Sequence, residues 1–260
     1  MTLFAGEIER ALVALGLGAA RTVPLVWLVP AFGGPALPAQ LRLALGLGLA
    51  VLCYPVVAGH VPAGGPLLWL LLLGREVAVG VTMGFVASCL FRALEAAGRL
   101  TDILRGANMA EVIAPLSEGR TSPMGNLLML LGVVAFLEMG GLGYLSTALA
   151  RSYEAMPVGG GLIRHGQTWA AVAIAASAKL IESAVALAAP AIVALLLADV
   201  TLGVLGRAAP QVPLYFVGMP LKALLGVGAV LFGLAALDVA MVAGFRGFLG
   251  LLQHVFHPDR

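Results

Sequence analysis

Charged residues that interrupt apolar stretches are the first candidates for chemistry in this sequence. They are Arg75, Glu76, Lys179, Glu182, Asp199 and Asp238. Lys179 and Glu182 are three residues apart, so on a helix they would share a face and could pair. Carboxylates inside a membrane also serve as proton relays. Two interpretations remain open for this set: ion pairs that fix the register of packed helices, or a proton path through Glu76, Asp199 or Asp238.

Histidines and cysteines form no pattern typical of a catalytic or metal site. His254 and His257 lie close to Asp259, and we expect all three to be solvated. Patterns such as GxSxG, HExxH and the Walker sequence are absent, so we expect no enzyme activity, no metal and no cofactor. Cys53 and Cys89 lie in apolar runs and are expected to be small buried side chains, with a disulfide as the alternative.

The segment from Arg92 to Arg120 is the most polar part of the chain. It reads RALEAAGRLTDILRGANMAEVIAPLSEGR, while the sequence on both sides is mostly Leu, Ala, Val and Gly. Its first part has the spacing of an amphipathic helix, on which Arg99 and Asp102 could pair at i,i+3. Backbone that is not helical must find hydrogen bonds in protein or water at membrane depth. We therefore expect this segment to line something wet or to dock on partner protein.

A loop is expected where this helical pattern ends, from Gly106 to Pro115. Gly106 permits a sharp exit from a helix, and Pro115 cannot continue a regular backbone ladder. The residues of this 106–115 loop that we single out are Gly106, Ala107, Asn108, Met109, Ala110, Glu111, Val112, Ile113 and Pro115. Its apolar side chains could pack on a core or close a pore, since hydrophobic constrictions gate by dewetting. Taken alone, the residues favour packing.

The composition is that of an integral membrane protein. Hydrophobic residues make up 61% of the 260 residues, charged residues only 11%, and the mean hydropathy is +1.03. A soluble domain is usually about one quarter charged. The net charge of +2, without a basic stripe, indicates no nucleic-acid partner. Glu7 and Glu9, in a first stretch without a basic cluster, argue against a cleaved signal peptide.

The hydrophobic pattern predicts an all-α fold, with Pro and Gly clusters between the helices. The expected segments are 5–30, 40–58, 66–104, 122–150, 167–206 and 217–253. The two longest exceed the thickness of a bilayer, so we expect bent helical hairpins and a kink at Pro190. Several charge-free runs are shorter than the roughly 20 residues of a lipid-exposed span. This pattern favours helices that pack largely on protein within an assembly.

Small residues at helical spacing predict close helix packing. Gly80 and Gly84 form a GxxxG pattern, and Gly244, Gly247 and Gly250 recur every third residue. They could bring together helices of this chain or helices of different subunits.

The segment from Ala209 to Lys222 is expected to form a turn and then enter a helix, because Pro210, Pro213 and Pro220 each lack a backbone donor. Lys222 would lie in the first turn of that helix, where the helix dipole disfavours a cation. We therefore expect an acidic group to pair with Lys222, either on this chain or on a neighbouring subunit.

Several short motifs run in a recognisable order along nearly the whole chain. They are Pro38-x-x-x-Arg42, Arg75-Glu76 with Gly80 and Gly84, EAAGRLTDILRGANMAEVIAP followed by EGRTSPMGNLLMLL, Ser152-Tyr153 with Pro157, Ala209-Pro210-Gln211, and Gly218-Met219-Pro220-Leu221-Lys222. Together they resemble the FliR/SctT family, a subunit of the export gate of type III secretion systems. Asp102 with Arg105-Gly106, and Thr121-Ser122-Pro123, are more similar to the injectisome branch, SctT, than to the flagellar branch, FliR.

The chain departs from the family pattern at a few positions. Ala114 stands where the family commonly has Asp before the loop-ending Pro, and Pro213 stands two residues after Gln211 in place of Asn. Met109 and either Val112 or Ile113 replace aromatic residues that are common in the flagellar loop.

The resemblance implies one export-gate subunit over residues 1–260, with approximate halves 1–158 and 159–260. It implies a hetero-oligomer with FliP/SctR-like and FliQ/SctS-like subunits and a FliB/SctU-type (FlhB-like) switch subunit, in the bacterial inner membrane within the secretion system base. That assembly surrounds a narrow channel for unfolded secreted proteins, held shut by a loop of this subunit. The resemblance thus moves the 106–115 loop from packing toward plug.

Spacing and helix position suggest roles for the other charged residues that we single out. Arg99, Asp102, Lys179 and Glu182 are expected to form structural ion pairs, and Lys222 to contact a partner. The alternative from another functional class is a small proton-coupled secondary transporter.

Overall fold

Every regular element in the described part of the chain is a helix. The computed structural model describes residues 2–34, 37–62, 64–107, 122–158, 160, 166–211, 216–231 and 247. The elements are α1 (Thr2–Leu28), η1 (Pro30–Phe32), α2 (Ala39–Ala58), α3 (Pro66–Leu104), α5 (Pro123–Glu138), α6 (Gly141–Ala155) and α7 (Gly166–Ala208), followed by a helix over Phe216–Leu231. The all-α prediction is confirmed.

Within the described residues, four helices are long and apolar enough to cross a membrane. They are α1 from Glu7 onward, α2, α3 and α7 from Trp169 onward, and a fifth span results if α5 and α6 are counted together. α3 has 39 residues and α7 has 43, so at a rise of about 1.5 Å per residue each is close to twice as long as a bilayer core is thick. Each nevertheless runs as one helix, and α7 continues through Pro190.

The expected helix over residues 122–150 is wrong, because the chain breaks it at Met139 and Gly140. α5 and α6 meet there at an angle of 74°. Gly140 has a φ of 71°, a left-handed conformation that glycine adopts without steric cost. The last described helix covers Phe216–Leu231, so Pro220 lies inside it and Lys222 follows two residues later.

The chain forms two compact units, and each draws on separated stretches of sequence. Unit 1 comprises Met1–Cys89, Phe136–Ser177 and Arg246–Arg260, and unit 2 comprises Leu90–Ala135 and Ala178–Phe245. The division into halves at residue 158 stays a prediction.

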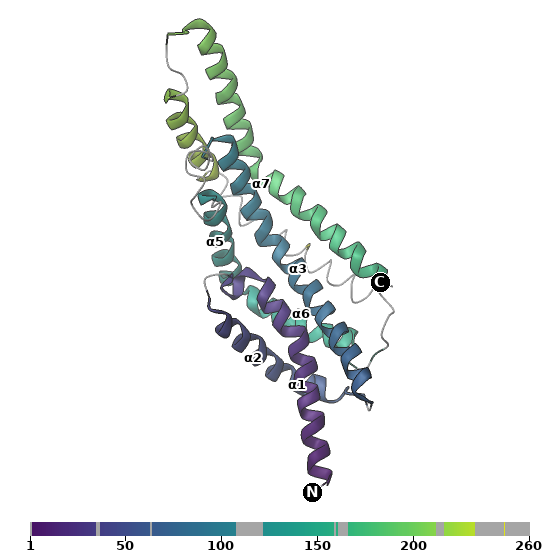
Figure 1. Ribbon diagram of the computed structural model, residues 1–260. Coiled ribbons are helices and arrows are strands. Elements are labelled where there is room, and N and C mark those ends of the chain that lie inside the picture. The colour runs from purple at the N-terminus through teal and green to yellow at the C-terminus, as the bar shows by residue number, and fades with distance from the viewer. Residues whose placement is uncertain are drawn as a thin grey trace. The chain divides into compact units, whose positions relative to one another are not determined.

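In unit 1, α1 and α2 lie side by side and are joined by the short η1 turn (Figure 1). α3 approaches α1 closely at the predicted GxxxG pattern. A Cβ at Gly80 would overlap the Arg21 carbonyl group, and one at Gly84 would lie 3.0 Å from the Leu28 Cβ. Gly80 and Gly84 thus pack helices of this chain against one another.

In unit 2, α3 and α5 cross at a second pair of glycines. A Cβ at Gly98 would lie 2.5 Å from the Met124 carbonyl oxygen, and one at Gly125 would lie 2.9 Å from the Glu95 carbonyl oxygen. Backbones this close leave no room for side chains at the crossing, so the first turn of α5 is fixed against the last turns of α3.

Cys53 and Cys89 are free thiols, which excludes a disulfide between them.

Candidate functional site

The chain leaves α3 through a well-formed helix end that begins the 106–115 loop. Gly106 has a φ of 78°, and its N–H donates to the Ile103 carbonyl at 3.1 Å. The Ala107 N–H donates to the Asp102 carbonyl at 3.0 Å. These two bonds form a Schellman motif, in which a left-handed glycine satisfies the last carbonyls of a helix. Asn108, Met109, Ala110, Glu111, Val112, Ile113 and Pro115 lie outside the described residues.

One carboxylate, Asp102, joins the two ends of this loop region. Its Oδ2 accepts hydrogen bonds from the Ser122 hydroxyl and from the Met124 N–H, the latter at 3.0 Å, and its Oδ1 lies 2.6 Å from Arg105 Nη2. The Asp102 side chain is 1% exposed. Ser122 also accepts from the Gly125 N–H at 2.9 Å, which makes Ser122 the N-cap of α5. The end of α3 and the start of α5 are thus held together at the points where the chain enters and leaves residues 106–121.

The helix over Phe216–Leu231 also contacts the end of α3. Lys222 Nζ donates to the Leu104 carbonyl at 3.5 Å and forms an ion pair with Asp199 of α7. A Cβ at Gly226 would lie 3.3 Å from Arg105 Cδ, so the helix passes close to the same turn. The acidic group expected for Lys222 is therefore present on this chain, and Asp199 has a partner that its sequence neighbours did not reveal.

The predicted pair of Arg99 with Asp102 is wrong. Arg99 Nη2 donates to Glu95 Oε1 at 2.5 Å, one turn earlier on α3, while Asp102 pairs with Arg105. The cause is the buried network around Asp102, which turns its carboxylate toward the start of α5 and away from Arg99.

The predicted pair of Lys179 with Glu182 is present, with Nζ and Oε2 3.0 Å apart. Its side chains are 52% and 69% exposed in this chain. Within the chain by itself this pair is therefore exposed.

A second polar cluster, centred on Arg21 of α1, was missed by the sequence analysis. Arg21 Nε donates to Glu76 Oε2 at 2.6 Å, Nη1 to the Ser152 hydroxyl at 2.9 Å, and Nη2 to the Met156 carbonyl at 3.0 Å. The guanidinium carbon lies 4.0 Å from the centre of the Tyr153 ring. Both charged side chains of the Arg21–Glu76 pair are fully buried. The cluster therefore joins α1, α3 and the end of α6 through one cation.

The neighbouring residues complete this cluster within unit 1. Arg75 Nη1 donates to the Pro157 carbonyl at 3.0 Å and lies 3.7 Å from Glu76 Oε1. The Tyr153 hydroxyl donates to the Gly18 carbonyl at 3.2 Å. The motifs Arg75-Glu76 and Ser152-Tyr153 with Pro157, far apart in sequence, thus meet at Arg21. A signal was available, because an arginine and a glutamate that each interrupt an apolar helix are expected to pair.

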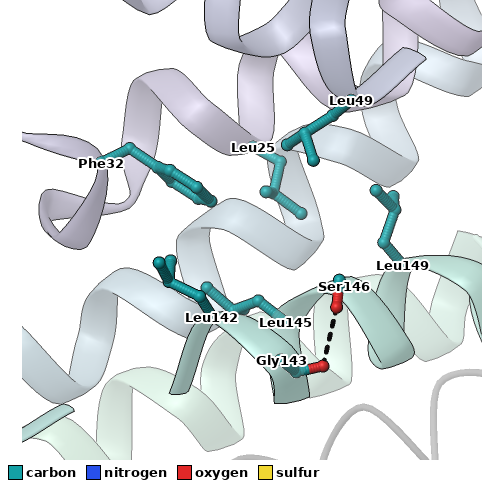
Figure 2. Close-up of a pocket in the computed structure, with 8 residues that line it drawn as sticks. All are labelled: Leu25, Phe32, Leu49, Leu142, Gly143, Leu145, Ser146 and Leu149. Carbon is teal, nitrogen blue, oxygen red and sulfur yellow. Dashed lines mark hydrogen bonds between the residues drawn. The ribbon is translucent and has the colours of Figure 1, made fainter. Parts of the chain in front are cut away.

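An apolar pocket of about 330 Å³ also lies in unit 1, among α1, η1, α2 and α6. Figure 2 shows its lining, which is Leu25, Phe32, Leu49, Leu142, Gly143, Leu145, Ser146 and Leu149. The only hydroxyl among them, that of Ser146, donates to the Gly143 carbonyl at 2.8 Å. With no ionisable side chain in its lining, the pocket suits an apolar group and offers no acid or base.

Among the described residues, no group of three or more His, Cys, Asp or Glu side chains could hold a metal ion.

Comparison with known proteins gives a consistent family match. Residues 12–247 match the family described as bacterial export proteins, family 1. The chain is 32% identical to the secretion system apparatus protein SsaT of Salmonella typhimurium, over 85% of this chain and 86% of that protein. It is 31% identical to the Yop proteins translocation protein T of Yersinia pestis, over 85% of each chain. It is 26% identical to the flagellar biosynthetic protein FliR of Caulobacter vibrioides, over 96% of this chain and 99% of that protein.

Proposed function

Because the chain belongs to family 1 of the bacterial export proteins, whose members are components of type III secretion and flagellar export machinery, we propose that it is a structural and gating subunit of a type III secretion channel. The channel would pass unfolded proteins across the inner membrane. The injectisome branch is favoured by identities of 32% and 31% to its members, against 26% to a flagellar relative. Several helices apolar enough to span a membrane fit this location.

The observation that carries the gating role is the double attachment at Asp102. A plug must keep its position against a pore while its tip can move aside. Asp102 accepts a hydrogen bond from Ser122 and forms an ion pair with Arg105, so the ends of the loop region are one side chain apart. Loops with adjacent ends pack as compact units and are frequently functional. The apolar residues Met109, Val112 and Ile113 between these ends would then form the seal.

The proposed partners are FliP/SctR-like and FliQ/SctS-like subunits, with a FlhB-like switch subunit. Their contact would cover apolar helix faces that the described part of this chain leaves open. Only 17% of the most apolar stretch of α2 and 22% of that of α7 is buried within the chain, compared with 61% for α3. Large exposed apolar surfaces mark contacts with protein or membrane.

Serine substitutions in the loop test the plug in cells that produce the complete gate. Replacing Met109, Val112 and Ile113 together keeps the loop length and its anchors but removes the apolar seal. We expect normal assembly and increased uptake of a small dye or of ions. The matched control is Glu111→Gln, which changes the same loop without removing an apolar residue and is expected to leave permeability unchanged. Assembled triple mutants with wild-type permeability would return the loop to a packing role.

Purification separates this proposal from the proton-coupled transporter. An export-gate subunit should be recovered in a hetero-oligomer when produced with its partner subunits and should form no stable homo-oligomer alone. A transporter should be a stable monomer or homo-oligomer in detergent, whether or not the other subunits are present. Recovery of a stable homo-oligomer in both conditions contradicts the proposed function.

A further inference from the structure

A narrow stripe of α3, just before the 106–115 loop, faces away from the other described residues of unit 2. Arg92, Ala96, Arg99 and Ile103 follow one another at spacings of four, three and four, which places them on one helix face. The side chains of Arg92 and Arg99 are 57% and 56% exposed, and Ile103 is 57% exposed. Most of the intervening residues are buried. We refer to these four residues as the arginine stripe.

Both arginines are held in place by the same carboxylate. Arg92 Nη1 donates to Glu95 Oε2 at 2.8 Å, and Arg99 Nη2 donates to Glu95 Oε1 at 2.5 Å. The Glu95 side chain is only 10% exposed, so it is a fixed support for two outward-facing guanidinium groups. Neither group has a second hydrogen-bond partner among the described residues. Each therefore keeps free N–H donors, already oriented, for a group beyond the described residues.

The charge of the stripe identifies the class of occupant. Two guanidinium groups share one carboxylate, which leaves an excess positive charge on a helix apolar enough to cross a membrane. An exposed cation in such surroundings requires an anion or water. The planar fork of arginine matches a carboxylate through two parallel hydrogen bonds.

The shape of the stripe favours a helix over a free anion or a lipid headgroup. Ala96 lies between the arginines and carries only a methyl group, and small residues at such positions let helix backbones approach closely. Ile103 extends the surface with an aliphatic side chain that an anionic headgroup would leave uncovered. The arginines are seven residues apart, about 10 Å along the axis, so carboxylates one or two turns apart on a second helix could reach both.

From these features we infer that the arginine stripe docks an acidic helix of a neighbouring export-gate subunit. This inference rests on the proposed function, because it requires the hetero-oligomer. The interface places the neighbour beside the start of the loop, where its acidic residues complete the coordination of Arg92 and Arg99.

Substitution of Arg99 tests the docking, with Lys179 as the matched control. Lys179→Gln removes a cation that is also half-exposed and also paired with a glutamate on its own helix. The measurement is the fraction of the chain recovered in the hetero-oligomer on native gels. Arg99→Gln should lower it on the order of tenfold or more, since a charge pair at an interface loses its partner. Arg99→Lys should restore part of the loss, and Lys179→Gln should match wild type.

Thermal unfolding of each chain alone, in detergent, shows whether a variant still folds. If Arg99→Gln unfolds at a lower temperature than wild type, Arg92→Gln replaces it as the test, because Glu95 then keeps its ion pair with Arg99. Arg99→Gln gates that assemble as wild type does overturn the inference. So does normal assembly combined with lost export, which places the stripe in the channel. Lipid binding is tested by the thermal stability of the gates in phosphatidylglycerol and in phosphatidylcholine nanodiscs. If Arg99→Gln gates assemble normally but lose a stabilisation by phosphatidylglycerol that wild-type gates show, the stripe binds lipid, and the inference is also overturned. If wild type does not join its partners, the proposed function fails as well.

Discussion

The Arg21 cluster and the arginine stripe place arginines in opposite situations. Arg21 is fully buried, and each of its three nitrogens donates to a group of the same chain. The side chains of Arg92 and Arg99 are more than half exposed, and each donates one hydrogen bond to Glu95. The first arrangement is closed and can serve only the fold. The second leaves donors free and is suited to a contact outside the chain.

The difference is one of cost as well as geometry. A buried ion pair must offset the loss of hydration of both ions, so its removal one side at a time leaves an uncompensated charge. An exposed pair stays solvated and contributes little to stability. Mutations in the two regions should therefore separate folding defects from assembly defects.

The largest expected effect comes from breaking the Arg21 cluster. Arg21→Met removes the hydrogen-bonded cation of the buried Glu76 carboxylate and leaves only Arg75, 3.7 Å away, so it should lower the free energy of unfolding by about 3–5 kcal/mol. The double change Arg21→Met with Glu76→Leu removes both charges and should recover much of that loss. Thermal unfolding of the purified chain in detergent measures both.

Lys179→Ala provides the comparison for that experiment, because its pair is exposed and should contribute about 0–1 kcal/mol. A wild-type melting temperature for Arg21→Met would mean that the buried cluster does not hold unit 1 together.

A smaller effect is expected at the crossing of α3 and α5. Gly98→Ala would place a Cβ 2.5 Å from backbone atoms of Met124 and Gly125 and force the helices apart, at a cost of about 1–3 kcal/mol. The control is Gly203→Ala in α7, where nothing lies within 4 Å of the added Cβ. That change should stabilise the chain by about 0.5–1 kcal/mol, because alanine is the better helix former. Equal unfolding temperatures for the two variants would contradict the close crossing.

The smallest effect is expected at the Lys222–Asp199 pair, which is partly exposed. Lys222→Glu places two carboxylates together and should destabilise the chain by about 0.5–1 kcal/mol, and Lys222→Gln by less. Exchange of the charges, with Asp199→Lys added to Lys222→Glu, should restore stability. If the exchanged variant unfolds like Lys222→Glu, Lys222 has a partner other than Asp199.

The sequence was sufficient to predict the helices, because their apolar composition and their Pro and Gly boundaries are local features. The segments expected at 40–58 and 66–104 correspond to α2 and α3 within one residue. The break at Gly140 was not predicted, because a glycine within an apolar helical pattern is equally compatible with close helix packing. Its left-handed conformation accompanies the bend between α5 and α6, which no local spacing encodes.

The polar clusters were predictable only in part, because their members are distant in sequence. Glu76, Ser152 and Met156 lie 55, 131 and 135 residues from Arg21, so no spacing rule could group them. The choice of Glu95 over Asp102 as the partner of Arg99 depends on Ser122 and Met124, which reach Asp102 from α5. Both carboxylates lie within helical reach of Arg99, and only the tertiary contact decides between them.

Single-channel conductance of purified, fully assembled gates tests most directly whether a loop fastened at Asp102 closes the channel. Asp102→Ala removes the hydrogen bonds to Ser122 and Met124 and the ion pair with Arg105. Wild-type gates should show no openings, and Asp102→Ala gates should open repeatedly. Ser122→Ala gates keep the hydrogen bond from the Met124 N–H to Asp102, so they should open less often than Asp102→Ala gates. Assembled Asp102→Ala gates as silent as wild type would contradict the account.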